Sequence, residues 1–92
     1  MQKNQKFTIL VVDDVKESRV IAEEILAAAK YRLRSASNGV DALRMVKQYH
    51  FDLILLDIAM PDMSGLEVCR FLKMEKHSSH IPVIFLTGST EK

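Results

Sequence analysis

Four short segments of the chain are apolar enough to be strands, and a longer amphipathic stretch follows each of the first three. Residues 7–12 (FTILVV), 53–58 (LILLDI) and 83–86 (VIFL) are rich in aliphatic and β-branched side chains, whereas residues 31–35 (YRLRS) are more polar. Nearly uninterrupted apolar runs of this length suit strands buried on both faces, as in parallel sheets. The pattern therefore predicts four strands, with the polar second strand at an edge of the sheet.

The stretches between these strands carry apolar residues at helical spacing, which is typical of amphipathic helices that pack against a sheet. One helix is expected from Val15 to Ala29, a second from about Val40 to Gln48, and a third after Ser64. Each is predicted to turn one apolar stripe to the core. The stripes are Val15, Ile21, Ile25, Ala28 and Ala29, then Val40, Leu43, Met45 and Val46, then Leu66, Cys69, Phe71 and Leu72.

Two of the expected helices begin with recognisable capping residues. Asn38 precedes the second helix, and Asn is one of the residue types preferred at an N-cap. Ser64 and Glu67 have the Ser-x-x-Glu spacing of a capping box, in which each side chain accepts from the other residue's backbone N–H. These residues predict where the second and third helices begin.

Strands and helices alternate along the whole sequence, which predicts one α/β domain over residues 1–92. Such alternation favours a doubly wound parallel sheet with right-handed crossovers and helices on both faces. In open sheets of this kind, ligands bind beyond the carboxyl ends of the strands, where the strand order reverses. Candidate chemistry is therefore expected at the carboxyl ends of the four strands.

Three acidic residues lie at those ends. Asp13 and Asp14 come directly after the first strand, and Asp57 lies near the end of the third. Neighbouring strands would hold these carboxylates about 5 Å apart, and their repulsion raises pKa values unless a cation neutralises them. Oxygen ligands with high negative charge suit a hard divalent ion such as Mg²⁺. In the alternative interpretation, Asp13 and Asp14 only cap the first helix.

Asp57 also suits a second role, because a carboxylate beside Mg²⁺ can act as a nucleophile toward a phosphoryl group. The phosphoryl oxygens would need donors, and the hydroxyl of Thr87 and the backbone N–H groups after Asp57 are candidates. Threonine is common at the ends of strands, so Thr87 indicates a phosphoryl-binding site only because it accompanies the three aspartates. Pro61 is expected to stiffen the following loop, and Gly65 to ease its entry into the third helix.

Composition narrows the classes of function. Thirteen Lys and Arg residues against twelve Asp and Glu residues give a formal net charge of +1, which offers no general field for nucleic acid or an anionic membrane. The local cluster of Lys30, Arg32 and Arg34 is interpreted as a solvated rim. There is one cysteine, Cys69, no apolar run near the ~20 residues of a membrane span, and no cleavable leader pattern. A reducing cytoplasm is therefore expected.

Four motifs, in order along the chain, carry a family resemblance. They are VVDD after the first strand, NGVDAL at the second helix, DLILLDIAMPDMSGLEVCRFLK around the third strand and helix, and IPVIFLTG at the fourth strand. From about residue 7 to residue 88, the chain closely resembles the CheY-like receiver domain of two-component response regulators. The resemblance implies a flavodoxin-like fold. It also implies that Asp57 accepts a phosphoryl group from a histidine of a sensor kinase or phosphotransfer protein.

The resemblance assigns roles to individual residues. Asp14 and Asp57 would bind Mg²⁺ (or Mn²⁺) directly, Asp13 would act mainly through water, and the backbone carbonyl of Ala59 would complete the protein ligands. Thr87 matches the hydroxyl residue that moves toward the phosphoryl group on activation. The loop behind the acceptor is matched by Met60, Pro61 and Gly65. Such a domain is a phosphoacceptor rather than an enzyme, with at most self-catalysed phosphotransfer and dephosphorylation.

The sequence departs from the family pattern after the fourth strand. A complete receiver continues with a fourth helix, a fifth strand and a fifth helix, whereas Lys92 lies five residues after Thr87. The expected architecture is therefore a truncated, (βα)3β portion of the fold, without the phosphoryl-binding lysine of the fifth strand and with impaired switching. Residues 83–86 would form an exposed sheet edge, and the sheet face beside the first helix would be partly uncovered. A homodimer or higher assembly through these surfaces is expected.

Two other functions stay open at this point. The chain could be a dimerisation or assembly module that keeps the front half of the fold without being phosphorylated. It could also be a Mg²⁺-dependent phosphatase with an aspartyl nucleophile, of the haloacid-dehalogenase kind. Such phosphatases usually carry a second Asp two residues after the nucleophile, where this chain has Ala59, so the receiver interpretation is favoured.

Overall fold

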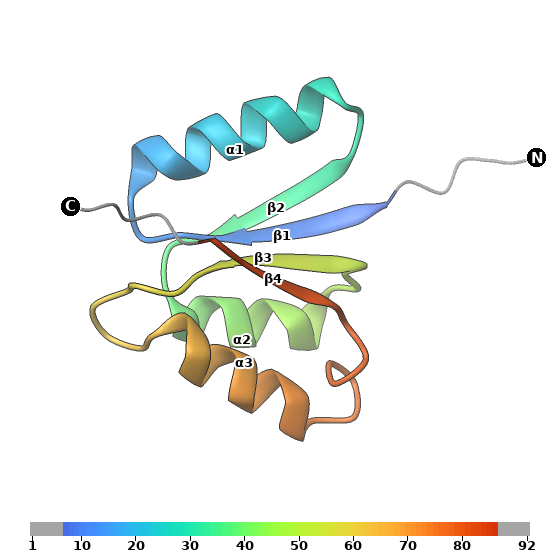
Figure 1. Ribbon diagram of the computed structural model, residues 1–92. Coiled ribbons are helices and arrows are strands. Elements are labelled where there is room, and N and C mark those ends of the chain that lie inside the picture. The colour runs from blue at the N-terminus through green and yellow to red at the C-terminus, as the bar shows by residue number, and fades with distance from the viewer. Residues whose placement is uncertain (1–6, 87–92) are drawn as a thin grey trace, which may run out of the picture.

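The structure is a computed structural model that describes residues 7–86 of the 92-residue chain. Strands and helices alternate along it (Figure 1). In chain order the elements are β1 (Thr8–Val12), α1 (Lys16–Ala28), β2 (Arg32–Ala36), α2 (Gly39–Gln48), β3 (Leu53–Asp57), α3 (Gly65–Met74) and β4 (Val83–Leu86). The strands and helices predicted from the hydrophobic pattern are confirmed, with only small differences at their ends.

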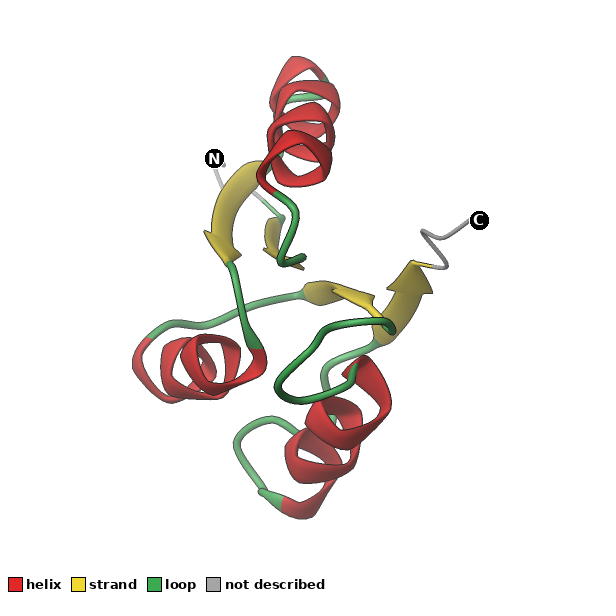
Figure 2. Ribbon diagram, turned by 90° about the vertical axis from the view of Figure 1, so that its left-hand side faces the viewer, coloured by secondary structure: helices red, strands yellow, loops and turns green. Residues whose placement is uncertain are grey.

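All four strands are parallel and lie in the order β2-β1-β3-β4. Helix α1 covers one face of the sheet, and α2 and α3 lie side by side on the other (Figure 1; Figure 2). The strand order reverses at β1, because the chain first adds β2 on one side and then β3 on the other. This arrangement confirms the doubly wound parallel sheet and places the polar β2 at an edge.

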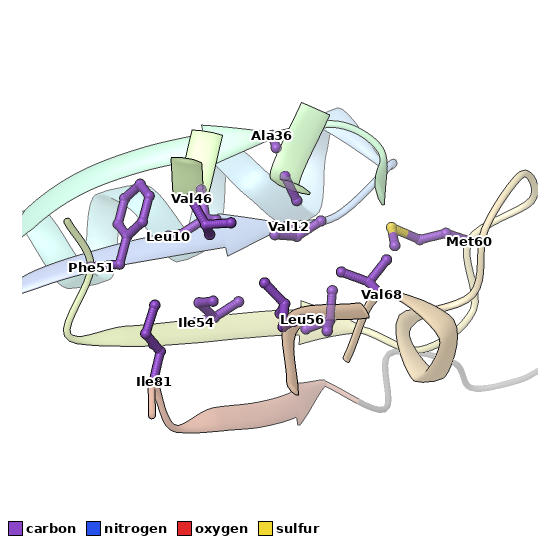
Figure 3. Close-up of a cluster of buried hydrophobic side chains, with 12 residues drawn as sticks. Leu10, Val12, Ala36, Val46, Phe51, Ile54, Leu56, Met60, Val68 and Ile81 are labelled. Atoms are coloured by element: carbon purple, nitrogen blue, oxygen red, sulfur yellow. The ribbon is translucent and has the colours of Figure 1, made fainter. Parts of the chain in front are cut away.

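The main core lies between the sheet and the layer formed by α2 and α3 (Figure 3). The strand residues at its centre are Leu10, Val12, Ile54 and Leu56. Phe51 and Met60 lie toward opposite ends of this cluster, and both side chains are buried. On the other face, Ile9 and Val11 of β1 are buried as well. The central strand β1 is therefore apolar on both faces, as its uninterrupted hydrophobic run predicts.

The predicted caps of α2 and α3 are confirmed. The Asn38 side-chain oxygen accepts from the backbone N–H of Asp41 at 2.8 Å. The Ser64 hydroxyl accepts from the N–H of Glu67 at 3.2 Å, and the Glu67 carboxylate accepts from the N–H of Ser64 at 3.1 Å. Each cap satisfies backbone donors that the first helical turn leaves without intrahelical partners.

The faces that α2 and α3 turn to the core differ in part from the predicted ones. Val40, Leu66 and Phe71 are about half exposed, so their prediction as inward-facing residues is wrong. A Cβ atom on Gly39 would lie 2.7 Å from Cγ2 of Val68, so small residues are needed where the two helices meet. The buried positions are Gly39, Ala42, Val46, Gly65, Val68 and Leu72. The other predicted positions are half-buried, namely Leu43, Met45 and Cys69.

Helix α1 buries less than its pattern predicts. It has no fully buried residue, and Ile21 and Ile25 are 57% and 63% exposed, so the predicted inward stripe is wrong. The half-buried apolar residues of α1 are instead Ala22 and Leu26. Among the described residues, α1 is the one helix on its face of the sheet, and it packs mainly over β1 and β2. Within residues 7–86, neither α1 nor any shorter helix has the length and apolarity to cross a membrane.

Candidate metal-binding and phosphoacceptor site

The sheet register brings three acidic residues together at the carboxyl ends of β1 and β3. Val12 pairs with Leu56, so Asp13, which follows β1, lies beside Asp57 at the end of β3. Asp13, Asp14 and Asp57 each offer one carboxylate oxygen, and these oxygens all lie within 4.8 Å of one another. Asp13 and Asp57 are buried, whereas Asp14 is partly exposed to solvent. The parallel sheet thus gathers the three carboxylates at one accessible point.

Both the backbone and the side chain of Asp13 make hydrogen bonds. Its backbone N–H donates to the carbonyl of Ala36 at 3.1 Å, and its own carbonyl accepts from the Arg19 guanidinium at 2.9 Å. Its carboxylate oxygen Oδ1 accepts from the N–H of Val15 at 2.9 Å. Val15 itself occupies the N-cap of α1 and makes no side-chain capping bond. Asp13 therefore supports the start of α1, as the alternative interpretation predicted in part, and it also belongs to the acidic cluster.

The pKa of Asp57 is raised above its ordinary value. Burial is the main cause, and the negative charges of Asp13 and Asp14 raise the pKa further. The backbone N–H of Ala59 donates to Oδ1 of Asp57 at 3.2 Å and partly opposes the shift. A cation at this point would favour the ionised form of Asp57 and relieve the repulsion among the three acids.

The spacing of the three carboxylates fits a divalent cation. Two oxygens bound to one Mg²⁺ ion lie at most about 4.2 Å apart, since each Mg–O bond is about 2.0–2.1 Å long. The oxygens of Asp13, Asp14 and Asp57 lie within 4.8 Å of one another, so a small torsion of one side chain, or one bridging water, completes the fit. Because these ligands are all oxygen, the site suits a hard ion better than zinc.

The loop behind Asp57 is closed by one backbone carbonyl. The carbonyl of Ile58 accepts from the N–H of Met60 at 3.1 Å and from the N–H of Gly65 at 2.9 Å. The Met60 side chain is buried in the main core, while Pro61 is exposed. A Cβ atom on Gly65 would overlap the carbonyl oxygen of Asp57. Gly65 is thus required by close contact with the backbone of the acceptor strand, a more specific reason than the easy turn that the sequence suggested.

Thr87 and Ala59 are the other residues that the sequence predicts for the site. Thr87 lies outside the described residues. Ala59 lies two residues after the end of β3 and is exposed, and its N–H donates to Oδ1 of Asp57. Sequence reasoning overlooked Arg19, which fixes the carbonyl of Asp13. The available clue was a long basic side chain about one turn into the helix that follows Asp13.

Comparisons with known proteins agree with this geometry. Residues 9–92 match the family described as the response regulator receiver domain. The chain is 46% identical over 90 residues to a probable cyclic di-GMP phosphodiesterase of Vibrio cholerae, a match that covers 98% of this chain and 20% of that protein. It is 34% identical over 85 residues to the polar-differentiation response regulator DivK of Brucella ovis, covering 92% of this chain and 69% of DivK. The chain therefore spans about a fifth of the first relative's length.

Solved structures give the same result. Chemotaxis protein CheY4 of Vibrio cholerae has a TM-score of 0.88 at 30% identity, covering 95% of this chain and 72% of that chain. The receiver domain of a sensor histidine kinase from Pseudomonas aeruginosa PAO1, solved with magnesium in its active-site cleft, has a TM-score of 0.86 at 26% identity, covering 92% and 70%. A chain of the complex between histidine kinase ThkA and response regulator TrrA has a TM-score of 0.82 at 36% identity, covering 92% and 72%.

A doubly wound parallel sheet with three carboxylates at its carboxyl edge defines the class of CheY-like domains, and residues 7–86 contain its (βα)3β portion. The chain belongs to the response regulator receiver family and is a receiver domain of two-component signalling. Domains of this family are phosphoacceptors, generally not classed as enzymes, and they pair with histidine kinases. A non-phosphorylated assembly module is not favoured by this membership.

Proposed function

We propose that Asp57 of this chain receives a phosphoryl group from a phosphohistidine of a sensor kinase or of a histidine phosphotransfer protein. The meeting of Asp13, Asp14 and Asp57 at one edge of the sheet carries the proposal. Asp57 is well situated for the role, because it ends β3, next to the central strand β1, and has one oxygen oriented by the N–H of Ala59. The reaction would take place in the cytoplasm, where ATP maintains phosphohistidine donors.

In the transfer, one carboxylate oxygen of Asp57 attacks the phosphorus atom of the phosphohistidine. A P–O bond forms, the P–N bond breaks with its electron pair going to the imidazole nitrogen, and that nitrogen takes up a proton. The attack needs the ionised form of Asp57, which burial and the neighbouring charges disfavour. The product is an acyl phosphate on Asp57, and it adds negative charge to an already acidic edge.

The residues around Asp57 would share the stabilisation of this charge. We infer that Asp14 and Asp57 bind Mg²⁺ (or Mn²⁺) directly, with Asp13 acting through water and the carbonyl of Ala59 as a further ligand. The bound cation would neutralise part of the charge on the carboxylates and the phosphoryl oxygens. The hydroxyl of Thr87, which follows β4 in the sequence, would donate a hydrogen bond to the phosphoryl group.

Intact mass measurement after incubation with Mg²⁺ and acetyl phosphate tests this proposal. We expect a gain of one phosphoryl group, which Asp57→Asn abolishes and which removal of Mg²⁺ by EDTA strongly reduces. Asp62→Asn is the matched control, because Asp62 is an exposed aspartate in the following loop and should leave the gain unchanged. An equal gain in the Asp57→Asn protein would show that Asp57 is not the acceptor.

We also propose that a second copy of the chain binds at the β4 edge and the adjoining sheet face. Strand β4 is the outer strand of the described sheet, and Ile84 is 52% exposed. Because Val83 and Phe85 pack against the main core, Ile84 points to the opposite face, which carries α1. The exposed Ile21 and Ile25 of α1 add apolar surface that burial in a dimer would stabilise.

Sedimentation at micromolar concentration tests this association. We expect a dimer or larger species for the unaltered chain, and a shift toward monomer for Ile84→Lys. Leu66→Lys is the matched control, since Leu66 is 58% exposed on α3, on the other side of the sheet. A stable folded monomer of the unaltered chain would contradict the proposed dimer and would leave the phosphorylation experiment unaffected.

A further inference from the structure

A basic hollow of about 380 Å³ opens along the outer side of β2. Three elements line it, and each contributes one arginine, namely Arg19 from α1, Arg34 from β2 and Arg44 from α2. Asp41 is the one acidic residue in the lining among residues 7–86. The hollow adjoins the acidic site, because Arg19 and Ala36 in its lining both hydrogen-bond to the backbone of Asp13. None of the three clustered aspartates lines the hollow itself. The three guanidinium groups give it a positive character that the near-neutral chain as a whole does not have.

Two of these arginines are held in place by neighbours. The guanidinium carbon of Arg34 lies 3.6 Å from the centre of the Tyr49 ring, and Arg44 contacts the Asp41 carboxylate at 3.1 Å. A guanidinium group has five N–H donors in one plane, so contact with a ring face or one carboxylate oxygen leaves most of them available. Arg34, which lies on the ring face, therefore loses less entropy when it binds an anion, whereas the Arg44–Asp41 pair is exposed to solvent and holds Arg44 only weakly. Arg34 is therefore more than part of the solvated rim that its sequence neighbourhood suggested.

The size and lining of the hollow indicate the class of ligand. Its volume lies within the usual range of small-molecule sites, about 300–1,000 Å³, and is larger than a lone phosphate ion requires. Three guanidinium groups against one carboxylate match the charge of a phosphate monoester, about −1.5 to −2 at neutral pH. Met45 and Tyr49 supply apolar wall for a flat organic group, and Ser35 and Ser37 supply hydroxyls.

We propose that this hollow binds a small phosphate monoester with a planar organic group, of the nucleoside monophosphate class. The phosphate would lie between Arg34 and Arg44, which can each donate two parallel N–H bonds to its oxygens. Arg19 would contribute mainly charge, since it already donates to the carbonyl of Asp13 at 2.9 Å. The organic group would lie against Met45 and Tyr49.

Titration of the full chain with AMP and GMP, followed by isothermal calorimetry, tests the proposal. EDTA is present throughout, so that metal-dependent phosphate binding at Asp57 does not contribute. We expect saturable binding with a Kd at or below about 1 mM, weaker binding of inorganic phosphate, and no binding of adenosine. Arg34→Gln and Arg44→Gln should each weaken AMP binding about tenfold, the usual effect of losing one charge-assisted contact.

Arg70→Gln is the matched control for the loss of one positive charge. Arg70 lies on α3, is exposed and does not line the hollow, so AMP binding should be unchanged. Circular dichroism of each variant confirms that the fold persists. The proposal is overturned if AMP shows no saturation, if adenosine binds as well as AMP, or if Arg70→Gln weakens binding as much as Arg44→Gln.

Discussion

Gly65 lies so close to the backbone of Asp57 that any side chain on it would overlap the Asp57 carbonyl oxygen. The same Cβ atom would lie 2.9 Å from the carbonyl carbon of Asp57. The N–H of Gly65 also donates to the next carbonyl, that of Ile58, at 2.9 Å. The first turn of α3 is thereby fixed against the end of the strand that carries the acceptor. Because the obstructing atoms are backbone, they cannot rotate away as a side chain would.

Gly65→Ala is expected to destabilise the chain by about 1–3 kcal/mol, because the start of α3 must move away from β3. Urea unfolding measures this loss. Gly39→Ala is the control, since its added Cβ would meet the side chains of Val68 and Met63, which can adjust more easily than backbone. If Gly39→Ala lowers the free energy of unfolding more than Gly65→Ala does, the contact between Gly65 and the Asp57 backbone is not the tighter constraint.

Asp57→Asn is expected to stabilise the metal-free chain at neutral pH. The folded-state pKa of Asp57 is raised, so ionised Asp57 lowers the free energy of unfolding above that pKa. As the pH falls through the folded-state pKa, Asp57 takes up a proton in the native state first, and the unaltered chain regains stability relative to the variant. Below the unfolded-state pKa of about 3.9, this contribution has vanished.

Urea unfolding in EDTA, at pH 7 and again near pH 4, measures that difference. The gain from Asp57→Asn should be clear at pH 7 and should shrink at the lower pH. Asp62→Asn, at an exposed position, should show no such gain at pH 7. A stabilisation by Asp57→Asn that grows as the pH falls would mean that the sign of the pKa shift is wrong.

Mg²⁺ is expected to stabilise the unaltered chain and to bind less tightly as the pH falls. Protons compete with the metal for Asp57, and its raised pKa starts this competition at a higher pH than for an ordinary aspartate. A free Mg²⁺ concentration one hundred times the Kd should add about 2.7 kcal/mol to the free energy of unfolding. Thermal unfolding across a Mg²⁺ series measures the effect.

Asp14→Asn should remove most of this stabilisation, because Asp14 supplies one of the three carboxylates without being buried itself. The exposed Asp62 serves again as the control position. If Mg²⁺ stabilised the Asp14→Asn and Asp62→Asn proteins equally, the metal would not bind at Asp14.

The strands and the helix starts could be predicted from the sequence because each depends on local chemistry. Residues 53–57 form β3 because their aliphatic side chains are buried on the core face of the parallel sheet and half-buried on the other face. Ser64 begins α3 because its hydroxyl and the Glu67 carboxylate satisfy each other's backbone donors. Asp13 and Asp57 could be paired in advance because parallel strands end at the same edge of a sheet.

The inward faces of the helices could not be predicted from hydrophobicity, because they depend on contacts between elements distant in the sequence. Val40 is exposed and Gly39 is buried because Gly39 faces Val68 of α3, whose side chain would have to shift to admit a larger residue. Long-range packing, which a hydrophobic pattern does not encode, decides these positions.

Lys30 has a positive φ of 69°, a conformation that favours glycine, and it ends α1 in a hydrogen-bonded turn. Its N–H donates to Ala27 at 2.8 Å, and the N–H of Tyr31 donates to Leu26 at 3.1 Å, the pattern of a Schellman motif. Lys30→Gly should therefore stabilise the chain by about 0.5–1 kcal/mol, because glycine adopts this conformation without the clash of a Cβ atom. The urea midpoint measures the gain, and Lys30→Ala, which removes the charge but keeps the Cβ atom, is the control. A Lys30→Gly protein no more stable than Lys30→Ala would contradict the assigned strain.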